Sequence, residues 1–275
     1  MSEFAGKYGP WALIAGASEG TGAEFARLLA QKGFNLILVA RREGPLDALA
    51  AEIGAAEIGA ANGVQCITAS IDLTRKDAAA RMAEIAGDRE VGLLIANAGA
   101  DTNGTPFLDT DIANWDALVA MNVSTTMRLV HHFGRGMRAR GKGGMILVGS
   151  GACYGGLNGL GVYCAAKGFV MNLAEGLWAE LRHDGIDVLN LILGRTDTPA
   201  HRISLAKSGQ SLSTAGMASA VDVARVGLEQ LPHGPIYNWG SANDQPGFAP
   251  QSPDARRARI IAVEEMSAAY MGKKA

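Results

Sequence analysis

Residues 16–22 read Gly-Ala-Ser-Glu-Gly-Thr-Gly and follow the apolar run Trp11–Gly16. That run predicts a first strand, and Gly22–Lys32 predicts a helix, so the glycine-rich stretch forms the turn between them. Small residues there let backbone N–H groups approach a phosphate, and the helix N-terminus adds a positive dipole end. The spacing differs from Gly-x-Gly-x-x-Gly, and a plain tight turn is the alternative. The position after the first strand favours phosphate binding.

Strand-length apolar runs and longer amphipathic runs alternate along the rest of the chain. Runs such as Leu36-Ile37-Leu38-Val39 lack polar alternation, which is typical of parallel strands covered on both faces. Further strands are predicted at Asn35–Ala40, Val64–Ala69, Val91–Ala96, Gly144–Gly149, Ile186–Leu193 and Ile236–Trp239. Further helices are predicted at Pro45–Ile58, Arg75–Ala86, Ile112–Arg140, Gly161–His183, Val221–Gln230 and Ala255–Tyr270. This order predicts an α/β fold, a Rossmann-like doubly wound parallel sheet of about seven strands in one domain.

Composition narrows the classes of partner. The chain has 275 residues, 48% of them hydrophobic, and a net charge of −2 without a basic stripe, so neither nucleic acid nor a membrane surface is expected as a partner. Met1–Pro10 contains no apolar run, and no stretch approaches the roughly 20 apolar residues of a membrane span, which predicts a cytoplasmic protein. The three cysteines are irregularly spaced, so neither a disulfide framework nor a metal site is expected.

Polar residues or glycines follow most of the predicted strands. A doubly wound sheet binds its ligand beyond the carboxyl ends of its strands. The candidates there are Gly16, Ser18, Glu19, Gly20, Thr21, Gly22, Arg41, Arg42, Asp72, Leu73, Asn97, Ala98, Gly99, Ser150, Gly194 and Thr196. A nucleotide lying along this edge would meet them in turn.

The strongest chemical signal is Tyr163-x3-Lys167 at the start of a long predicted helix. Four-residue spacing places both side chains on one helix face. A nearby ammonium lowers the phenol pKa from its usual value of about 10, which makes a tuned general acid and base. Ser150 could present its hydroxyl to the same space, where negative charge develops on a carbonyl oxygen. Alone, the pair would more often be a packed Tyr beside a solvated Lys.

Together these motifs resemble a short-chain dehydrogenase/reductase of the compact single-domain branch, from about Trp11 to Trp239. The matching positions are Gly16, Gly20, Gly22, Asp72, Asn97-Ala98-Gly99, Asn122, Ser150, Tyr163, Lys167 and the stretch 194–198. Three positions depart from the family pattern. Ala15 replaces a threonine, Thr21 replaces a large aliphatic residue and Leu193 replaces a proline.

The resemblance implies a role for each matching residue. Tyr163 would exchange the proton with the substrate oxygen, and Lys167 would tune Tyr163 and hold the nicotinamide ribose. Ser150 would orient the carbonyl, and Asn122 would support a water-linked proton relay to Lys167. The remaining implied roles are Asn97 bracketing the cofactor, Asp72 and Leu73 meeting the adenine, and Thr196 touching the carboxamide.

Two arginines after the second strand decide the cofactor prediction. Arg41 and Arg42 stand where an acidic residue would grip the ribose hydroxyls of NAD, and two guanidinium groups suit a 2′-phosphate. NADP(H) is therefore predicted, with NAD(H) as the alternative. Glu19 weighs against this, because some family members carry a basic residue there.

The predicted activity is NAD(P)(H)-dependent interconversion of a carbonyl and a secondary alcohol, in the form of an NADPH-dependent reductase of a neutral ketone or aldehyde. The alternatives are a non-catalytic NADP-binding regulatory protein and an isomerase or dehydratase with a tightly held cofactor. Residues 197–217 are expected to form a mobile flap over the substrate or an ordinary surface loop, and residues 253–275 a helical tail. Resemblance to the family favours a homodimer or homotetramer through the two long helices.

Overall fold

The structure is a computed structural model that describes residues 3–55, 63–100, 104–207, 216–239, Ala262 and Glu265. Its main sheet has seven parallel strands in the order β3-β2-β1-β4-β5-β6-β9. In chain order these are β1 (Trp11–Ala15), β2 (Asn35–Ala40), β3 (Cys66–Ser70), β4 (Val91–Ala96), β5 (Gly143–Ser150), β6 (Ile186–Leu193) and β9 (Ile236–Trp239). The predicted doubly wound parallel sheet is confirmed.

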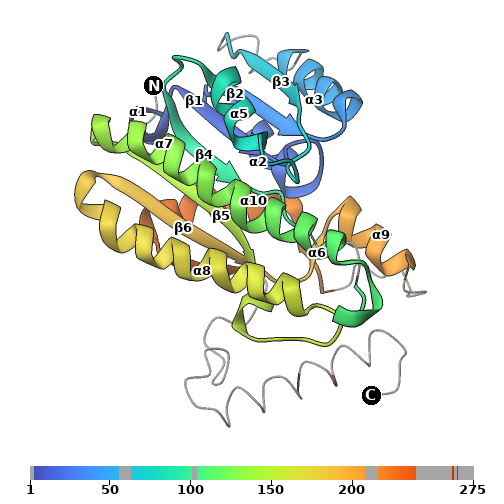
Figure 1. Cartoon of the computed structure of the whole chain (residues 1–275). Helices are drawn as coiled ribbons and strands as arrows, with labels where there is room; N and C mark the ends of the chain where they lie inside the picture. The colour runs from blue at the N-terminus through green and yellow to red at the C-terminus, as the bar shows by residue number, and fades with distance from the viewer. Residues whose placement is uncertain are drawn as a thin grey trace.

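Two hydrophobic cores fill the space on either side of the sheet, because alternate strand residues point to opposite faces. Leu36 and Leu38 belong to one core, and Ile37 and Val39 to the other. The first core also holds residues of α1 (Glu3–Tyr8), α2 (Gly20–Gln31), α3 (Glu43–Ala55) and α10 (Ala220–Gln230). The second holds residues of α5 (Ala78–Ala86), α7 (Thr126–Arg140) and α8 (Gly161–Leu181). Figure 1 shows α7 and α8 crossing in front of β4, β5 and β6.

The long helix predicted at Ile112–Arg140 is not continuous, and this corrects the prediction. It divides into α6 (Ile112–Val119), a π-helical segment η2 (Ala120–Thr125) and α7. A π-helical turn adds one residue per turn, which periodicity cannot reveal, and such turns are common at functional sites. Asn122 lies within it.

The N-terminal helix α1 is anchored at the amino-terminal edge of the sheet. Tyr8 is buried and donates a hydrogen bond to Asp187 of β6, which also forms an ion pair with Lys7. Burial, followed by the hydrogen bond to Asp187, raises the pKa of the Tyr8 phenol. Gly144 of β5 provides the space for Tyr8, because a methyl group there would lie 2.8 Å from the Tyr8 ring.

The predicted flap contains regular structure. Thr196–Asp197 forms β7, which pairs with β8 (Ala218–Ser219), and Pro199–Lys207 forms helix α9. Part of the predicted flap, residues 208–215, lies outside the described residues, and so does nearly all of the predicted tail helix. The short helical turns are η1 (Phe107–Asp109), η3 (Gly151–Tyr154), η4 (Arg182–Asp184) and η5 (Leu231–His233). Among the helices of the described residues, none has both the length and the apolar character needed to cross a membrane.

Candidate active site

The glycine-rich turn packs directly against the end of β4. Asn97 donates its side-chain amide to the Gly16 carbonyl at 2.8 Å, and the Ala98 amide donates to the Ala15 carbonyl at 2.8 Å. Gly16 has a φ of +90°, and a methyl group there would lie 2.7 Å from the Ala98 nitrogen. A methyl group at Gly22 would overlap the Gly16 carbonyl. Both positions therefore require glycine for this close approach.

A pocket of about 450 Å³ lies at the carboxyl ends of the strands beside this turn. Its lining includes eight of the predicted cofactor residues: Gly16, Ser18, Glu19, Arg41, Arg42, Asp72, Leu73 and Ala98. They come from the segments that follow β1, β2, β3 and β4. The other predicted cofactor residues lie outside this lining: Gly20, Thr21, Gly22, Asn97, Gly99, Tyr163, Lys167, Gly194 and Thr196.

Sequence reasoning missed the wall that α6 and η2 contribute to this pocket. The additional lining residues are Ala40, Ile71, Thr74, Ala100, Asn114, Ala117, Leu118 and Met121. The last four are spaced three, four and seven residues apart, as on one face of a helix. That spacing is visible in the sequence, but a face turned to a pocket has the same periodicity as a face turned to the core.

Charged side chains of both signs line the pocket. Arg42 forms an ion pair with Glu19 at 2.5 Å between Nη2 and Oε2. Asp72 accepts hydrogen bonds from the Thr74 amide and hydroxyl at 2.9 and 2.8 Å. These bonds, with the positive charge of Arg41 nearby, hold the pKa of the Asp72 carboxyl below its usual value. Each carboxylate thus has a partner within the pocket wall.

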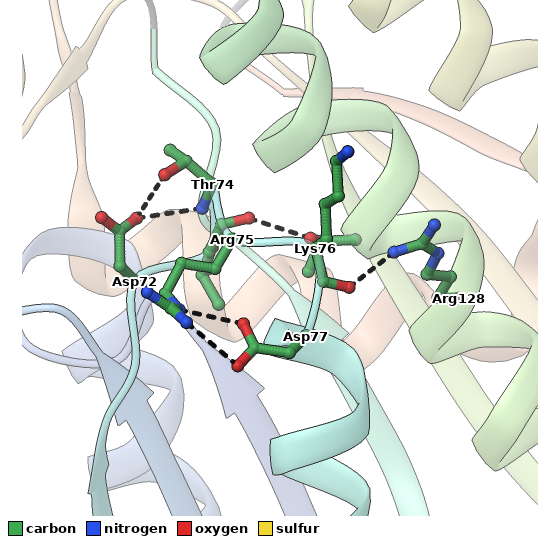
Figure 2. A network of polar contacts seen from close by, with 8 residues as sticks. Asp72, Thr74, Arg75, Lys76, Asp77 and Arg128 are labelled. Atoms are coloured by element: carbon green, nitrogen blue, oxygen red, sulfur yellow. Dashed lines mark hydrogen bonds and ion pairs between the residues drawn. The ribbon is translucent and has the colours of Figure 1, made fainter.

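The loop after β3 is anchored to the helix on its far side. Thr125 donates a hydrogen bond to the Leu73 carbonyl at 2.9 Å, and Arg128 donates one to the Lys76 carbonyl at 2.7 Å. Figure 2 shows Arg128 reaching from α7 to this loop, with the Asp72–Thr74 contacts at the other end. The loop that lines the pocket is therefore held from both ends.

Lys167 is buried within the sheet–helix interface. Its ammonium donates to the Val148 carbonyl of β5 at 3.0 Å and lies 5.7 Å from the centre of the Tyr163 ring. Burial lowers the pKa of Lys167 to about 8, and the neighbouring Cys153 thiol offsets part of that shift. Tyr163 is partly exposed and packs against a cluster that includes Trp115. The predicted pair thus has one buried member, Lys167, and one partly exposed member, Tyr163.

Asn122 and Lys167 meet at Gly99. A methyl group at Gly99 would lie 2.9 Å from Lys167 Nζ and would overlap Asn122 Oδ1. The Asn122 side-chain amide donates to the Leu118 carbonyl at 3.0 Å, whereas its buried Oδ1 has no hydrogen-bond partner among the described residues. An unpartnered buried acceptor is costly unless a ligand or water satisfies it. The π-helical turn therefore presents an open acceptor beside the lysine.

Ser150 ends β5 and caps the short turn η3 that follows. Its hydroxyl accepts a hydrogen bond from the Ala152 amide at 3.3 Å. The turn packs on α8, where the Cys153 carbonyl approaches Gly168, and Tyr154 donates to Asn238 of β9 at 2.7 Å. Ser150 therefore lies on a segment attached both to the helix that carries Tyr163 and to the edge strand.

The segment after β6 reaches the glycine-rich turn. Leu193 ends the strand, and buried Thr196 donates its hydroxyl to the Gly194 carbonyl at 3.3 Å. The Thr198 side chain lies against Gly20, where a methyl group would be 3.1 Å from Thr198 Cγ2. Thr198 was not among the predicted site residues, although it falls within the matching stretch 194–198.

The comparisons with known proteins all find dehydrogenases or reductases. Residues 10–208 match the model of a family described as short chain dehydrogenase. A 7β-hydroxysteroid dehydrogenase of Clostridium sardiniense is 30% identical over 240 residues, which cover 87% of this chain and 89% of that protein. A very-long-chain 3-oxoacyl-CoA reductase of Neurospora crassa is 36% identical over 186 residues, 66% of this chain and 55% of that protein. The chain thus spans only about half the length of that fungal relative.

Solved structures agree with the sequence matches. A 7β-hydroxysteroid dehydrogenase structure superposes with a TM-score of 0.78 at 26% identity, covering 99% of this chain and 100% of that one. A short-chain dehydrogenase from Sphingobium yanoikuyae in complex with NADPH gives 0.71 at 26% identity, covering 94% and 95%. In both, the similarity extends over nearly the whole of each chain.

Proposed function

The chain belongs to the short-chain dehydrogenase/reductase family and is an oxidoreductase, and from that premise we propose that it interconverts a carbonyl and a secondary alcohol with NADP(H), using Tyr163 as general acid and base. The observation that carries this proposal is the buried Lys167 ammonium, 5.7 Å from the Tyr163 ring and beside the open acceptor of Asn122. The charge on Lys167 favours the phenolate of Tyr163, which makes proton exchange at its oxygen feasible near neutral pH.

The residues present fit a nicotinamide dinucleotide. The pocket at the strand ends, the turn that excludes Cβ atoms at Gly16 and Gly22, and the unpartnered Asn122 Oδ1 all favour a bound polar ligand along this edge. The nicotinamide would supply or accept the hydride. Asp72 and Leu73 would meet the adenine, Asn97 would bracket the cofactor, and Thr196 would touch the carboxamide.

Each reacting side chain would then act on a defined atom. Ser150 would donate its hydroxyl to the substrate oxygen and hold it toward Tyr163, which would give that oxygen its proton during reduction. Lys167 would hold the ribose and keep the Tyr163 pKa low. Asn122 would accept a hydrogen bond from a water that returns protons to Lys167, which fits the open side of its Oδ1.

Replacing Tyr163 by phenylalanine tests the assignment of the acid and base. The Tyr163→Phe variant should lose turnover while it keeps its affinity for NADPH, because the ring and the buried lysine remain. Tyr154→Phe is the matched control, since it removes a phenol of the neighbouring turn that is engaged with Asn238. Turnover by Tyr163→Phe close to that of the wild type would contradict the proposal. If the wild type binds cofactor but reduces no carbonyl, the non-catalytic regulatory role would be supported instead.

NADP(H) is the proposed cofactor because Arg41 and Arg42 both line the pocket. A guanidinium binds a phosphate through paired, charge-assisted hydrogen bonds. Fluorescence titration of NADPH and NADH against the wild type and Arg41→Ala tests this. Equal affinity for both cofactors, or an Arg41→Ala variant that still binds NADPH normally, would contradict it.

We propose a neutral ketone or aldehyde as the substrate. The support comes from the name of one relative, a 7β-hydroxysteroid dehydrogenase, which describes a hydroxyl group on a steroid. The name of the other relative, a very-long-chain 3-oxoacyl-CoA reductase, describes a charged acyl thioester and favours the opposite outcome of the test. NADPH oxidation should be measured with steroid ketones, aromatic ketones, sugars and acyl thioesters. Activity restricted to sugars or thioesters would contradict a neutral apolar ketone.

A further inference from the structure

Glu19 places a carboxylate in the part of the pocket that we assign to the cofactor phosphate. It precedes α2 directly, and its partner Arg42 lies between β2 and α3, so the ion pair bridges two strand ends. Both side chains line the pocket, and both remain accessible, with exposures of 35% for Glu19 and 51% for Arg42. A dinucleotide that enters the pocket therefore meets a guanidinium that already has a counter-ion.

The two carboxylates of the pocket wall are held differently. Asp72 accepts two hydrogen bonds from Thr74 within its own loop, which fixes its position independently of any ligand. Glu19 is paired at 2.5 Å with Arg42, one of the two guanidinium groups that we assign to the phosphate. Of the two acids, Glu19 is the one that a competing anion would displace.

The cost of that displacement differs between the two cofactors. A 2′-phosphate is a strong acceptor for a guanidinium and would replace Glu19 on Arg42. The Glu19 carboxylate would then lose its partner and lie close to a like charge. Accessible ion pairs are weak, corresponding to a factor of about two to five in an equilibrium constant, and the repulsion adds to this loss. NAD(H), which carries a hydroxyl instead of the phosphate, leaves the ion pair intact.

We propose that Glu19 is a specificity-determining residue, which reduces the preference for NADP(H) by competing with the 2′-phosphate for Arg42. The ion pair narrows the difference in affinity between the two cofactors and keeps NAD(H) usable. This inference rests on the proposed function, because it requires that the pocket bind a nicotinamide dinucleotide.

The test is a comparison of dissociation constants for NADPH and NADH in two variants. Glu19→Gln keeps the size of the side chain and removes its charge, so NADPH affinity should rise about threefold to tenfold while NADH affinity stays within about twofold. Glu24→Gln is the matched control. Glu24 lies within α2, the helix that Glu19 precedes, and forms an ion pair with Arg27 at 2.7 Å, but it does not line the pocket. It should leave both affinities unchanged.

A double variant shows whether the effect passes through Arg42. In an Arg42→Gln background, Glu19→Gln should improve NADPH affinity clearly less than it does in the wild type. The NADPH gain of Glu19→Gln should also shrink at high ionic strength, because salt screens accessible charges.

The outcomes separate this inference from the proposed function. If Glu19→Gln leaves NADPH affinity relative to NADH affinity unchanged, the inference is overturned. A selective loss of NADH affinity would also overturn it, since Glu19 would then bind the ribose hydroxyls. A wild type that binds NADH more tightly than NADPH would contradict the proposed NADP(H) preference alone. An increase in NADPH affinity relative to NADH affinity in Glu19→Gln would still support the role of Glu19. A wild type that binds neither dinucleotide would overturn both.

Discussion

Thr125 donates a 2.9 Å hydrogen bond to the backbone carbonyl of Leu73 and so joins the π-helical turn to the loop that lines the pocket. Asn122, three residues earlier in the same turn, faces Gly99 and Lys167. The pocket at the strand ends and the buried lysine therefore share one short segment of backbone. A change in that segment is expected to affect both.

Thr125→Val tests this connection, because valine keeps the shape of the side chain and removes the donor. Thr125 is 4% exposed, so the Leu73 carbonyl would be left without its partner at a cost of about 1–3 kcal/mol in the free energy of unfolding. The affinity for NADPH should fall as well, since Leu73 borders the pocket. Urea unfolding and cofactor titration measure the two effects. Thr125→Ser, which restores the hydroxyl, should recover most of both, and equal behaviour of the two variants would contradict the role of the hydrogen bond.

Gly99→Ala should lower activity strongly, although it adds only one methyl group. The added methyl group would overlap Asn122 Oδ1, approach Lys167 Nζ to 2.9 Å and require a φ of +146°, which alanine rarely adopts. We expect kcat to fall at least about tenfold, because displaced side chains lose their alignment. Gly156→Ala is the matched control, since a methyl group there meets nothing within 4 Å. Full activity of Gly99→Ala in steady-state assays would show that the three residues are not tightly packed.

The sequence predicted the parts of the fold and site that depend on local patterns. Continuous apolar runs predicted the strands of the sheet within a few residues, because strands buried on both faces must be apolar throughout. Residues that follow those strands, such as Arg41, Asp72 and Ala98, then had to gather at one edge of the sheet, and they do line one pocket. The prediction follows from the topology of the sheet, because the carboxyl ends of parallel strands lie at the same edge.

What sequence reasoning missed depends on contacts between distant segments. The π-helical turn at Asn122 arises within an apparently regular amphipathic helix, where a single extra residue leaves the periodicity nearly unchanged. The ion pair between Glu19 and Arg42 joins segments that follow different strands. The sequence shows both charges, but the pairing follows from the side-chain positions.

Thr21→Val should stabilise the protein. Thr21 is buried, and its hydroxyl has no hydrogen-bond partner among the described residues. An unpaired buried hydroxyl costs about 1–3 kcal/mol, so replacement by valine of the same shape should raise the free energy of unfolding by about 1 kcal/mol in the absence of cofactor. Urea unfolding of the apo protein measures this. Thr126→Val, at a second buried threonine, provides a comparison. A loss of stability in Thr21→Val would show that the hydroxyl is satisfied in solution.

The protonation of Lys167 should make stability rise with pH in the alkaline range. Its pKa is lowered from 10.5 to about 8 by burial, so between these values the folded state has lost a proton that the unfolded state still binds. Unfolding then takes up a proton, and the free energy of unfolding increases with pH by up to about 3 kcal/mol. Below pH 8 both states are protonated, and the full cost of burying the charge remains.

Lys167→Met removes the titrating group, so the difference in unfolding free energy between wild type and variant should change between pH 8 and pH 10.5. Urea unfolding of both proteins across that range measures it, and the subtraction cancels other titrating groups. Parallel pH profiles would contradict a buried Lys167 with a lowered pKa.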